Sequence, residues 1–376
     1  MATVEKYQTK SGGTLYAVRY RKPDRGTTTK RGFRTKREAQ AWAEDVEIDK
    51  RTGSYVAPSL GRITVAELSE AWLARKKQSV APSSYHSMQS AYKAHVAPAW
   101  GRAPVADIDT LSIESWITTL SKKGLSAASV IRVHGVLAGI LQDGVKGKRL
   151  AVNPARGIEN LPRKTSRRHV YLSDDDVARL ADESGQHRAL VLTLAYCGVR
   201  WGEAIALRVR DVEFLRRRIA VHENAVQIGS RHAVGPTKGH ENRSVPVPEF
   251  VLDELSVQCA GKNASDLVFP GRSGYLPRPD SATGWFVAAV KRAGVETITP
   301  HDLRHTCASL AVSAGANVLA LARMLGHKDP SMTLRTYADL FDTDLDALAD
   351  TMHARYSHSN VLTACSPGAH EGTKSG

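Results

Sequence analysis

One segment constrains the fold of this chain more than any other. Residues 187–198, HRALVLTLAYCG, form a nearly uniform apolar run that ends at Gly198. A helix that is apolar on every side must be surrounded by other elements, so this segment predicts the centre of a sizeable core. The chain has no apolar run of about 18 residues, the length from which a membrane-spanning helix is inferred. We therefore expect no membrane span and a domain built around a buried helix.

Composition limits the partners more than the fold. The 376 residues suffice for two or three domains, and 42% of them are hydrophobic. Lys and Arg number 52 and Asp and Glu 38, which gives a formal net charge of +14. Such an excess indicates nucleic acid or an anionic membrane surface as the partner. The first residues, MATVEKYQTK, lack the apolar centre of a signal peptide, so we expect a cytoplasmic protein.

The cysteines indicate a reducing compartment. They are scattered along the chain and form no CxxC pair; the four are Cys197, Cys259, Cys307 and Cys365. We expect free thiols and no structural zinc.

Residues 1–60 are predicted to form a small separate module. TLYAVRYRK alternates with the period of a strand, PDRG is a turn, and TTTKRGF can pair back as a second strand. Thr35 and Glu38 then predict a capping box at the start of a helix. The basic side chains of the strand region are Arg19, Arg21, Lys22, Lys30 and Arg31. Two interpretations stay open, a solvated hairpin and a sheet that lies on DNA phosphates.

Residues 62–155 are predicted to form an all-helical domain. The helical patterns are VAELSEAWLARKK, SSYHSMQSAYKAHV, SIESWITTLSKKG and SAASVIRVHGVLAGILQDGVKGK, and Thr64 with Glu67 predicts a capping box for the first. GSYVAPSLGR before them is expected to be a linker. VNPARGIENLPRKTSRRHV after them is rich in proline and basic residues, and is expected to be a second linker, either wrapped on a duplex or merely exposed.

Residues 168–350 are predicted to form a mixed α+β domain. Ser173 is expected to cap the helix DDDVARLADES, whose acids suit the positive end of the helix dipole. RRIAVHENAV, HAVGPTKG and RSVPVP are expected to be three short strands. Further helices are expected near 281–293, 300–314, 317–325 and 331–341. Residues 356–376 are weakly patterned and are expected to be a flexible tail.

The segment TPHDLRHTCASL predicts an anion site at the start of a helix. Thr299 suits the N-cap and Pro300 the first helical position. His301 and Arg304 then share one face of the first turn, where helix amides already favour an anion. For His305, a histidine satisfied within the helix packing is the simpler interpretation.

The segment LGHKDPSMTLRTYADL supplies a histidine and a tyrosine. Gly326 is expected to end a helix, which places His327 just beyond it, and Asp329 with Pro330 is expected to start the next helix. Tyr337 then lies two turns into that helix. A tyrosine with a pKa near ~10 is a poor nucleophile at neutral pH. It becomes a useful one when cations surround the phosphate that it attacks and a base takes its proton.

Two further segments carry candidate cations. Arg200 in CGVRWGEAIAL follows the buried helix and a glycine turn, and Glu203, three residues later, can orient its guanidinium. A purely structural ion pair is the alternative. Lys238 in GPTKGHENRSVPV is expected at the tip of a β-hairpin, where a lysine is usually only a solvated charge.

Together these residues resemble the tyrosine recombinases. Arg200 in GVRWGE, Lys238, the HDLRH and LGH motifs, and a tyrosine ten residues after that last histidine agree with the family in order and spacing from about 170 to 340. One departure is Cys197, where a threonine is common. The resemblance implies a multidomain fold that is mainly α with small β-sheets. It consists of an αβ arm-binding module, an all-α core-binding domain and a mixed α+β catalytic domain.

The resemblance also implies the chemistry. Tyr337 would attack a DNA phosphodiester and form a 3′-phosphotyrosine, while Arg200 and Arg304 hold the non-bridging oxygens. Lys238 would protonate the leaving 5′-oxygen, His301 would accept the tyrosine proton, and His327 would donate a hydrogen bond to the phosphate. Glu203 would support Arg200. Neither a metal nor ATP is implied.

The implied partners follow from strand exchange between two duplexes. They are double-stranded DNA at core-type and arm-type sites, a homotetramer on that DNA, a host DNA-bending protein and an excision factor. The module at 1–60 favours the integrase of a phage or other mobile element, because Xer-type recombinases commonly lack it. The implied location is the cytoplasm of a bacterial host.

Other function classes remain as alternatives. His301, His305 and His327 suggest a zinc hydrolase, but the usual signature has Glu directly after the first His, and Arg304 would repel a cation. A type IB topoisomerase shares the tyrosine and arginine chemistry. A Xer-like or transposon-resolving recombinase would use the same residues for the same chemistry. A non-catalytic DNA-binding regulator would use none of them for catalysis.

Overall fold

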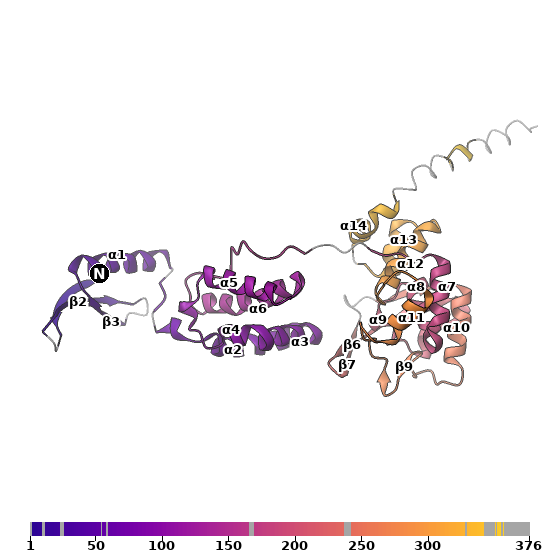
Figure 1. The fold of residues 1–376 in the computed structure, drawn as a ribbon, viewed down its shortest axis with the longest axis horizontal. Coiled ribbons are helices and arrows are strands. Elements are labelled where there is room, and N and C mark those ends of the chain that lie inside the picture. Colours follow the sequence, from indigo (N-terminus) through magenta and orange to yellow (C-terminus); the bar gives the residue numbers. More distant parts are fainter. Residues whose placement is uncertain are drawn as a thin grey trace, which may run out of the picture. The chain divides into compact units, whose positions relative to one another are not determined.

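The chain forms two compact units, Met1–Ser166 and Arg167–Gly376, in the computed structural model (Figure 1). The structure describes residues 2–9, 12–22, 26–53, 55–57, 59–164, 169–236, 242–327, 329–341, 350, 352–354 and 356. Of the tail expected at 356–376, all residues after Tyr356 lie outside the described residues, Cys365 among them. None of the helices in the described part of the chain is long and apolar enough to cross a membrane.

The N-terminal residues form a three-stranded antiparallel sheet and one helix. The elements are β1 (Thr3–Gln8), β2 (Thr14–Arg21), β3 (Thr27–Phe33) and α1 (Lys36–Thr52), with strand order β1-β2-β3. The sequence predicted β2, β3 and α1 but missed β1, whose residues are mostly exposed and carry little apolar pattern. The expected capping box is half formed. The Thr35 hydroxyl accepts from the Glu38 amide at 3.2 Å, whereas the Glu38 carboxylate accepts from the Arg34 amide.

The two faces of this sheet differ in chemistry. Val18 and Tyr20 of β2 pack on α1, as the strand alternation predicted. The register pairs Ala17 with Arg31, so Arg31 shares the opposite face with Arg19 and Arg21. The side chains of Arg19, Arg21, Lys30 and Arg31 are exposed, and that of Lys22 is half-buried. The open face is therefore basic.

A helical bundle follows in the first unit. Its elements are α2 (Val65–Ser79), α3 (Pro82–Ala91), a π-helical turn (Tyr92–Val96), α4 (Ala97–Trp100), α5 (Thr110–Lys122) and α6 (Ala127–Lys146). The predicted capping box of α2 is complete, because Thr64 Oγ1 accepts from the Glu67 amide and the Glu67 carboxylate accepts from the Thr64 amide. The buried face of α6 supplies much of the bundle core.

Part of the second expected linker is packed rather than exposed. Asn153 is buried and its Nδ2 donates to the Ala138 carbonyl of α6 at 2.9 Å. Asn160 Nδ2 donates to the Glu114 carbonyl of α5 at 2.7 Å. The segment up to about residue 160 therefore belongs to the bundle, which the composition alone concealed.

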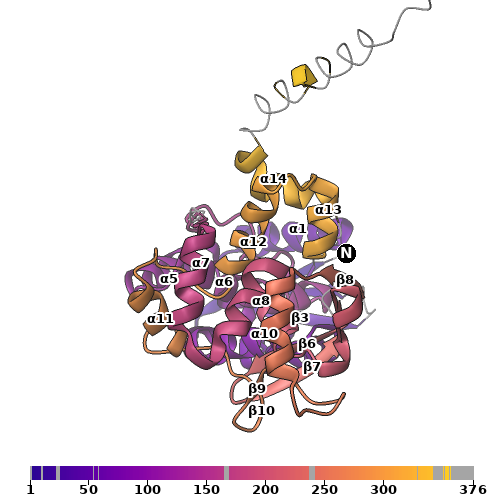
Figure 2. The same cartoon turned by 90° about the vertical axis from the view of Figure 1, so that its right-hand side faces the viewer.

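The second unit is built around the apolar helix. Its helices are α7 (Asp174–Glu183), α8 (Arg188–Cys197), α9 (Trp201–Ala204), α10 (Glu249–Cys259), α11 (Trp285–Ala293), α12 (Asp302–Ser313), α13 (Val318–Leu325) and α14 (Pro330–Phe341). All of α8 except Arg188 and Tyr196 is buried, as predicted, and it packs against α7, α10 and α12 (Figures 1 and 2). The sequence-based expectations did not include α10.

Small antiparallel sheets line this helical core. The strands are β4 (Val212–Glu213), β5 (Arg218–Val221), β6 (Glu223–Ile228), β7 (Arg231–Pro236), β8 (Arg243–Pro246), β9 (Pro270–Gly271) and β10 (Gly274–Tyr275). They form three sheets, β4-β5-β8, β6-β7 and β9-β10. The single strand expected for RRIAVHENAV is wrong, because the chain passes from one sheet to another at His222.

A comparison of Gly198 with Gly294 separates the cost of a left-handed backbone from the cost of steric crowding. Both end helices in the left-handed region, at φ 62° and φ 63°. A Cβ at residue 198 would lie 2.7 Å from Leu325 and 3.0 Å from the Cys307 sulfur, whereas one at residue 294 would meet nothing within 4 Å. We expect Gly294→Ala to cost about 1 kcal/mol and Gly198→Ala about 3 kcal/mol, measured by urea unfolding. Equal costs would show that the contacts around Gly198 relax freely.

Candidate active site

A buried carboxylate orients the first candidate arginine. Gly198 turns the chain at the end of α8, and Arg200 follows directly before the short helix α9. Glu203 is only 1% exposed. Its carboxylate accepts from the Arg200 amide and from Arg200 Nη1, both at 2.8 Å. The expected contact between Arg200 and Glu203 is therefore present, and it involves the backbone as well as the guanidinium.

A second arginine on the same carboxylate was not expected from the sequence. Arg243, at the start of β8, donates through Nη2 and Nη1 to Glu203 at 2.6 and 3.1 Å, and through Nε to the Met324 carbonyl at 3.1 Å. Burial alone would raise the pKa of Glu203, but the hydrogen bonds and charge of Arg243, with those of Arg200, lower it to about 2. The segment GPTKGHENRSVPV carried no signal that separates Arg243 from its other polar residues.

Arg304 lies deep in the same cluster. Its guanidinium donates to the carbonyls of Gly198 and Leu325, and the residue is only 3% exposed. Burial, and then the charge of Arg200, lower the pKa of Arg304 to about 10, so it is still a cation at neutral pH. The helix α12 begins at Asp302, two residues later than expected, because the preceding turn is of the i→i−3 type, with the Asp302 amide donating to the Thr299 carbonyl at 2.9 Å. The Asp302 carboxylate accepts from the amide and hydroxyl of Thr299.

Two histidines flank the arginines. His327 follows Gly326, which ends α13 in the left-handed region as predicted. His327 Nδ1 lies 2.8 Å from Thr333 Oγ1, which leaves Nε2 for a ligand. Burial and the neighbouring arginines lower the pKa of His327 to about 4. Partial desolvation of the ring and the charge of Arg304 also lower the pKa of His301. The residue as a whole is exposed. Both imidazoles are therefore neutral at pH 7.

Tyr337 is buried, at 1% exposure, in a small cluster of apolar side chains. It lies within α14, which begins at Pro330 as predicted, and its φ and ψ of −127° and 17° interrupt the helix there. Burial raises its pKa to about 12. Its hydroxyl lies 2.9 Å from Nδ1 of His305. The simpler sequence-based interpretation of His305, a histidine satisfied within the helix packing, therefore misses its contact with the candidate nucleophile.

Lys238 lies outside the described residues. Of the described strands on either side of it, β7 pairs with β6 and β8 pairs with β5. The hairpin of this region is β6-β7, which turns at Gly229 and Ser230.

The zinc hypothesis does not match the arrangement of the histidines. Among the residues that the structure describes, the one group of potential ligands that come together is His169, Asp302 and His305, with ligand atoms within 4.8 Å of one another. His301 and His327 are not part of it. The ring centroids of His169 and His305 lie 4.1 Å apart with 36° between the ring planes.

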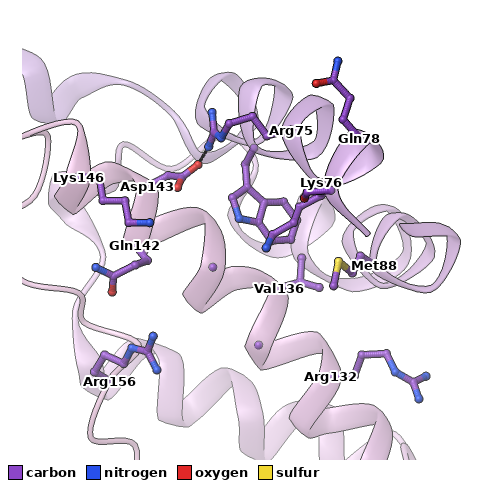
Figure 3. A pocket seen from close by; sticks show the side chains of 14 residues that line it. Arg75, Lys76, Gln78, Met88, Arg132, Val136, Gln142, Asp143, Lys146 and Arg156 are labelled. Atoms are coloured by element: carbon purple, nitrogen blue, oxygen red, sulfur yellow. Dashed lines mark ion pairs between the residues drawn. The ribbon is translucent and has the colours of Figure 1, made fainter. Parts of the chain in front are cut away.

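A second candidate site is a basic groove of about 740 Å³ in the helical bundle (Figure 3). Trp72 and Gly139 form part of its lining, and an added Cβ at Gly139 would lie 2.8 Å from the indole, which shows how closely α2 and α6 approach. The charged side chains that line the groove are Arg75, Lys76, Arg132, Lys146, Arg156 and Asp143. Asp143 forms an ion pair with Arg75, so the groove keeps a strong positive excess.

Comparison with known proteins finds family matches in both units. Residues 171–344 match the phage integrase family, and residues 64–121 match the phage integrase N-terminal SAM-like domain. The integrase of Mycobacterium phage D29 is 25% identical, over 79% of this chain and 78% of its own length. The tyrosine recombinase XerC of Rhodospirillum centenum is 27% identical, over 82% of this chain and 94% of its own length.

Solved structures show the same fold. The Tn1549 transposon integrase in complex with a circular intermediate DNA aligns with a TM-score of 0.63 at 20% identity, over 76% of this chain and 99% of that one. A lambda integrase dimer bound to a COC′ core site aligns with a TM-score of 0.55 at 19% identity, over 88% of this chain and 93% of that one. The two family matches and this shared multidomain fold show that the chain belongs to the phage integrase family of tyrosine recombinases.

Proposed function

We propose that this protein is a site-specific integrase that cuts and rejoins DNA through a 3′-phosphotyrosine at Tyr337. It integrates, and in reverse excises, a phage or other mobile element. The observation that carries the proposal is the convergence of Arg200, Arg243 and Arg304, from three separate segments, at the ends of α8 and α13. A cluster of oriented guanidinium groups is suited to a phosphodiester, because it stabilises the charge that grows on the non-bridging oxygens.

In the proposed reaction the Tyr337 oxygen forms a bond to phosphorus and the bond from phosphorus to the 5′-oxygen breaks. His301 accepts the phenol proton, Lys238 donates a proton to the leaving 5′-oxygen, and His327 donates a hydrogen bond to the phosphate. Arg200 and Arg304 hold the non-bridging oxygens. Attack by another 5′-hydroxyl reverses these steps on a new partner, and the retained phosphodiester energy makes ATP unnecessary. The cations perform the charge stabilisation that Mg²⁺ provides in many phosphoryl-transfer enzymes.

The basic surfaces of the first unit suit the DNA of such a reaction. The open face of the sheet, with Arg19, Arg21 and Arg31, is the proposed contact with arm-type sites, and Lys22 and Lys30 add charge beside it. The groove in the bundle is the proposed contact with core-type sites. These assignments correspond to an arm-binding module at 1–60, a core-binding domain at 62–155 and a catalytic domain at 168–350.

The assembly is proposed by analogy. A lambda integrase tetramer has been solved on a Holliday junction, and its fold aligns with this chain at a TM-score of 0.55. We infer a homotetramer on DNA in the bacterial cytoplasm, with a host DNA-bending protein and an excision factor as accessory partners. A Xer-like recombinase is the second candidate, because the XerC relative is matched over 94% of its length. The module at 1–60 favours the integrase.

The nucleophile is tested by trapping. A nicked suicide substrate carrying the attachment site should form a covalent complex with the wild-type protein and none with Tyr337→Phe, because the phenylalanine has no attacking oxygen. Tyr356, which is 68% exposed, gives the matched control, and Tyr356→Phe should form the complex normally. Peptide mapping of the nucleotide adduct to any residue other than Tyr337 would refute the assignment. A protein that binds the site without trapping would be a regulator.

The role of Glu203 in holding the arginines is tested by the stability of a variant that lacks its charge. Glu203→Gln should cost about 3 kcal/mol at pH 7, because it removes one charge from a buried ion-pair network. The folded-state pKa of Glu203 is lowered to about 2, so this stabilisation is present above the ordinary pKa of 4.5 and is lost as the pH falls towards 2. Urea unfolding of both proteins at pH 7 and near pH 3 measures the difference.

A surface pair provides the control for that measurement. Glu183 pairs with Arg292 at 2.8 Å and both side chains are largely exposed. Glu183→Gln should change the free energy of unfolding by less than about 1 kcal/mol. If the two substitutions have the same small effect, Glu203 does not hold the cluster together.

The basic groove is tested by the salt dependence of DNA binding. Arg132→Gln and Lys146→Gln should each weaken binding to a core site and reduce the slope of log affinity against log salt by about 0.9, the value for one phosphate contact. Lys122 of α5 is exposed and does not line the groove, so Lys122→Gln is the control. Slopes that are unchanged for all three variants would remove the groove from the DNA interface.

A further inference from the structure

The hydroxyl of Tyr337 is held by a histidine to which the proposed mechanism gives no role. Nδ1 of His305 lies 2.9 Å from the Tyr337 oxygen, and the phenol is buried against Ala308, Val312, Leu321 and Leu325. Among the described residues, no other hydrogen-bond partner of this oxygen is found. His305 therefore determines where the candidate nucleophile rests.

The protonation states of His305 and Tyr337 determine the character of this hydrogen bond. Burial, and then the neighbouring His169 and His301, lower the pKa of His305 to about 4, while burial raises that of Tyr337 to about 12. At neutral pH the imidazole is neutral, and in the tautomer that carries its proton on Nε2, Nδ1 accepts a hydrogen bond that the phenol donates. The two pKa values move in opposite directions, so transfer of the proton from the phenol to this imidazole is disfavoured. The contact keeps Tyr337 protonated rather than activating it.

His305 is braced by the segment that leads into the second unit. The ring of His169 lies against that of His305, with 4.1 Å between the ring centroids and 36° between the planes. Three residues later the Leu172 amide donates to Thr306 Oγ1 at 3.3 Å, and Tyr171 packs against the apolar cluster that contains Tyr337. The segment 169–172 thus lies along α12 and limits the positions open to the His305 ring.

This position of Tyr337 does not allow attack. The residue is 1% exposed, and a phosphodiester must contact the phenol oxygen directly. The helix α14 is interrupted at Tyr337 itself, so a change there can move the side chain without unwinding the whole helix. We propose that His305, braced by His169, is a positioning residue that holds Tyr337 in a buried resting state, and that breaking this hydrogen bond precedes DNA cleavage. The proposal rests on the proposed function of Tyr337.

Two measurements on the full-length protein test this proposal. Nitration of Tyr337 by tetranitromethane without DNA, followed by peptide mass spectrometry, reports how often the phenol leaves its position. Single-turnover cleavage of the nicked suicide substrate reports how often it reaches DNA. His305→Ala should raise both rates about fivefold, the factor for one net hydrogen bond, and His169→Ala about twofold.

Two variants control for loss of packing. His305→Asn places an acceptor oxygen near the position of Nδ1, so it should restore rates close to those of the wild type. His187 is a half-buried histidine of the same unit that stacks on Trp285 at 4.1 Å, away from the site. His187→Ala should change neither rate. Circular dichroism identifies any variant that does not fold. The variants that do fold still show whether the contact with His305 holds Tyr337.

The outcomes separate this proposal from the proposed function. Unchanged nitration in a folded His305→Ala or His169→Ala variant would show that the contact does not hold Tyr337. Faster nitration with slower cleavage would overturn the resting-state role, and would make His305 a group that the attack itself requires. If nitration responds as expected but the wild type forms no covalent product, the holding contact stands and the nucleophile assignment fails.

Discussion

The cation cluster depends on one buried carboxylate. Guanidinium groups that lie close together and away from water repel one another, and each needs a compensating charge or full hydrogen bonding. Glu203 accepts four hydrogen bonds, two from Arg200 and two from Arg243, and so fixes two cations with one charge. Arg304 has no such carboxylate and uses backbone carbonyls instead. The result is a cluster of three cations and one anion that retains a positive charge and is suited to an anionic ligand.

The backbone supplies the remaining partners through the ends of two helices. The carbonyls of Gly198, Leu325 and Gly326 face Arg304 and Arg200, and that of Met324 faces Arg243. The carbonyl ends of helices carry partial negative charge, so α8 and α13 stabilise the cations at this point. Both helices end in a left-handed glycine, which turns the chain away and leaves these carbonyls available. Packing of the apolar helix α8 therefore determines the geometry of the site as well as the core.

The sequence revealed the local motifs better than their long-range contacts. The buried α8, the glycine ends of α8 and α13, and the contact between Arg200 and Glu203 were predicted correctly. Each of these features involves residues that are close in the sequence, so spacing was sufficient. Arg243 was missed because its partners, Glu203 and Met324, are distant in the chain and no local pattern identifies them. The contact of His305 with Tyr337 was missed for the same reason. The division of 218–228 between two sheets likewise depends on strand pairing, which periodicity does not report.

The arginines also determine how the histidines behave. Burial lowers the pKa of His301 and of His327, and the neighbouring guanidinium groups lower it further, so the unliganded site contains neutral imidazoles beside permanent cations. A bound phosphodiester would bring a negative charge into the same cluster, and a nearby opposite charge raises the pKa of a histidine. In the proposed reaction, the substrate would then make His301 a better acceptor for the proton that leaves the tyrosine. Without such a charge, the lowered pKa values of the histidines and the burial of Tyr337 both favour the protonated phenol.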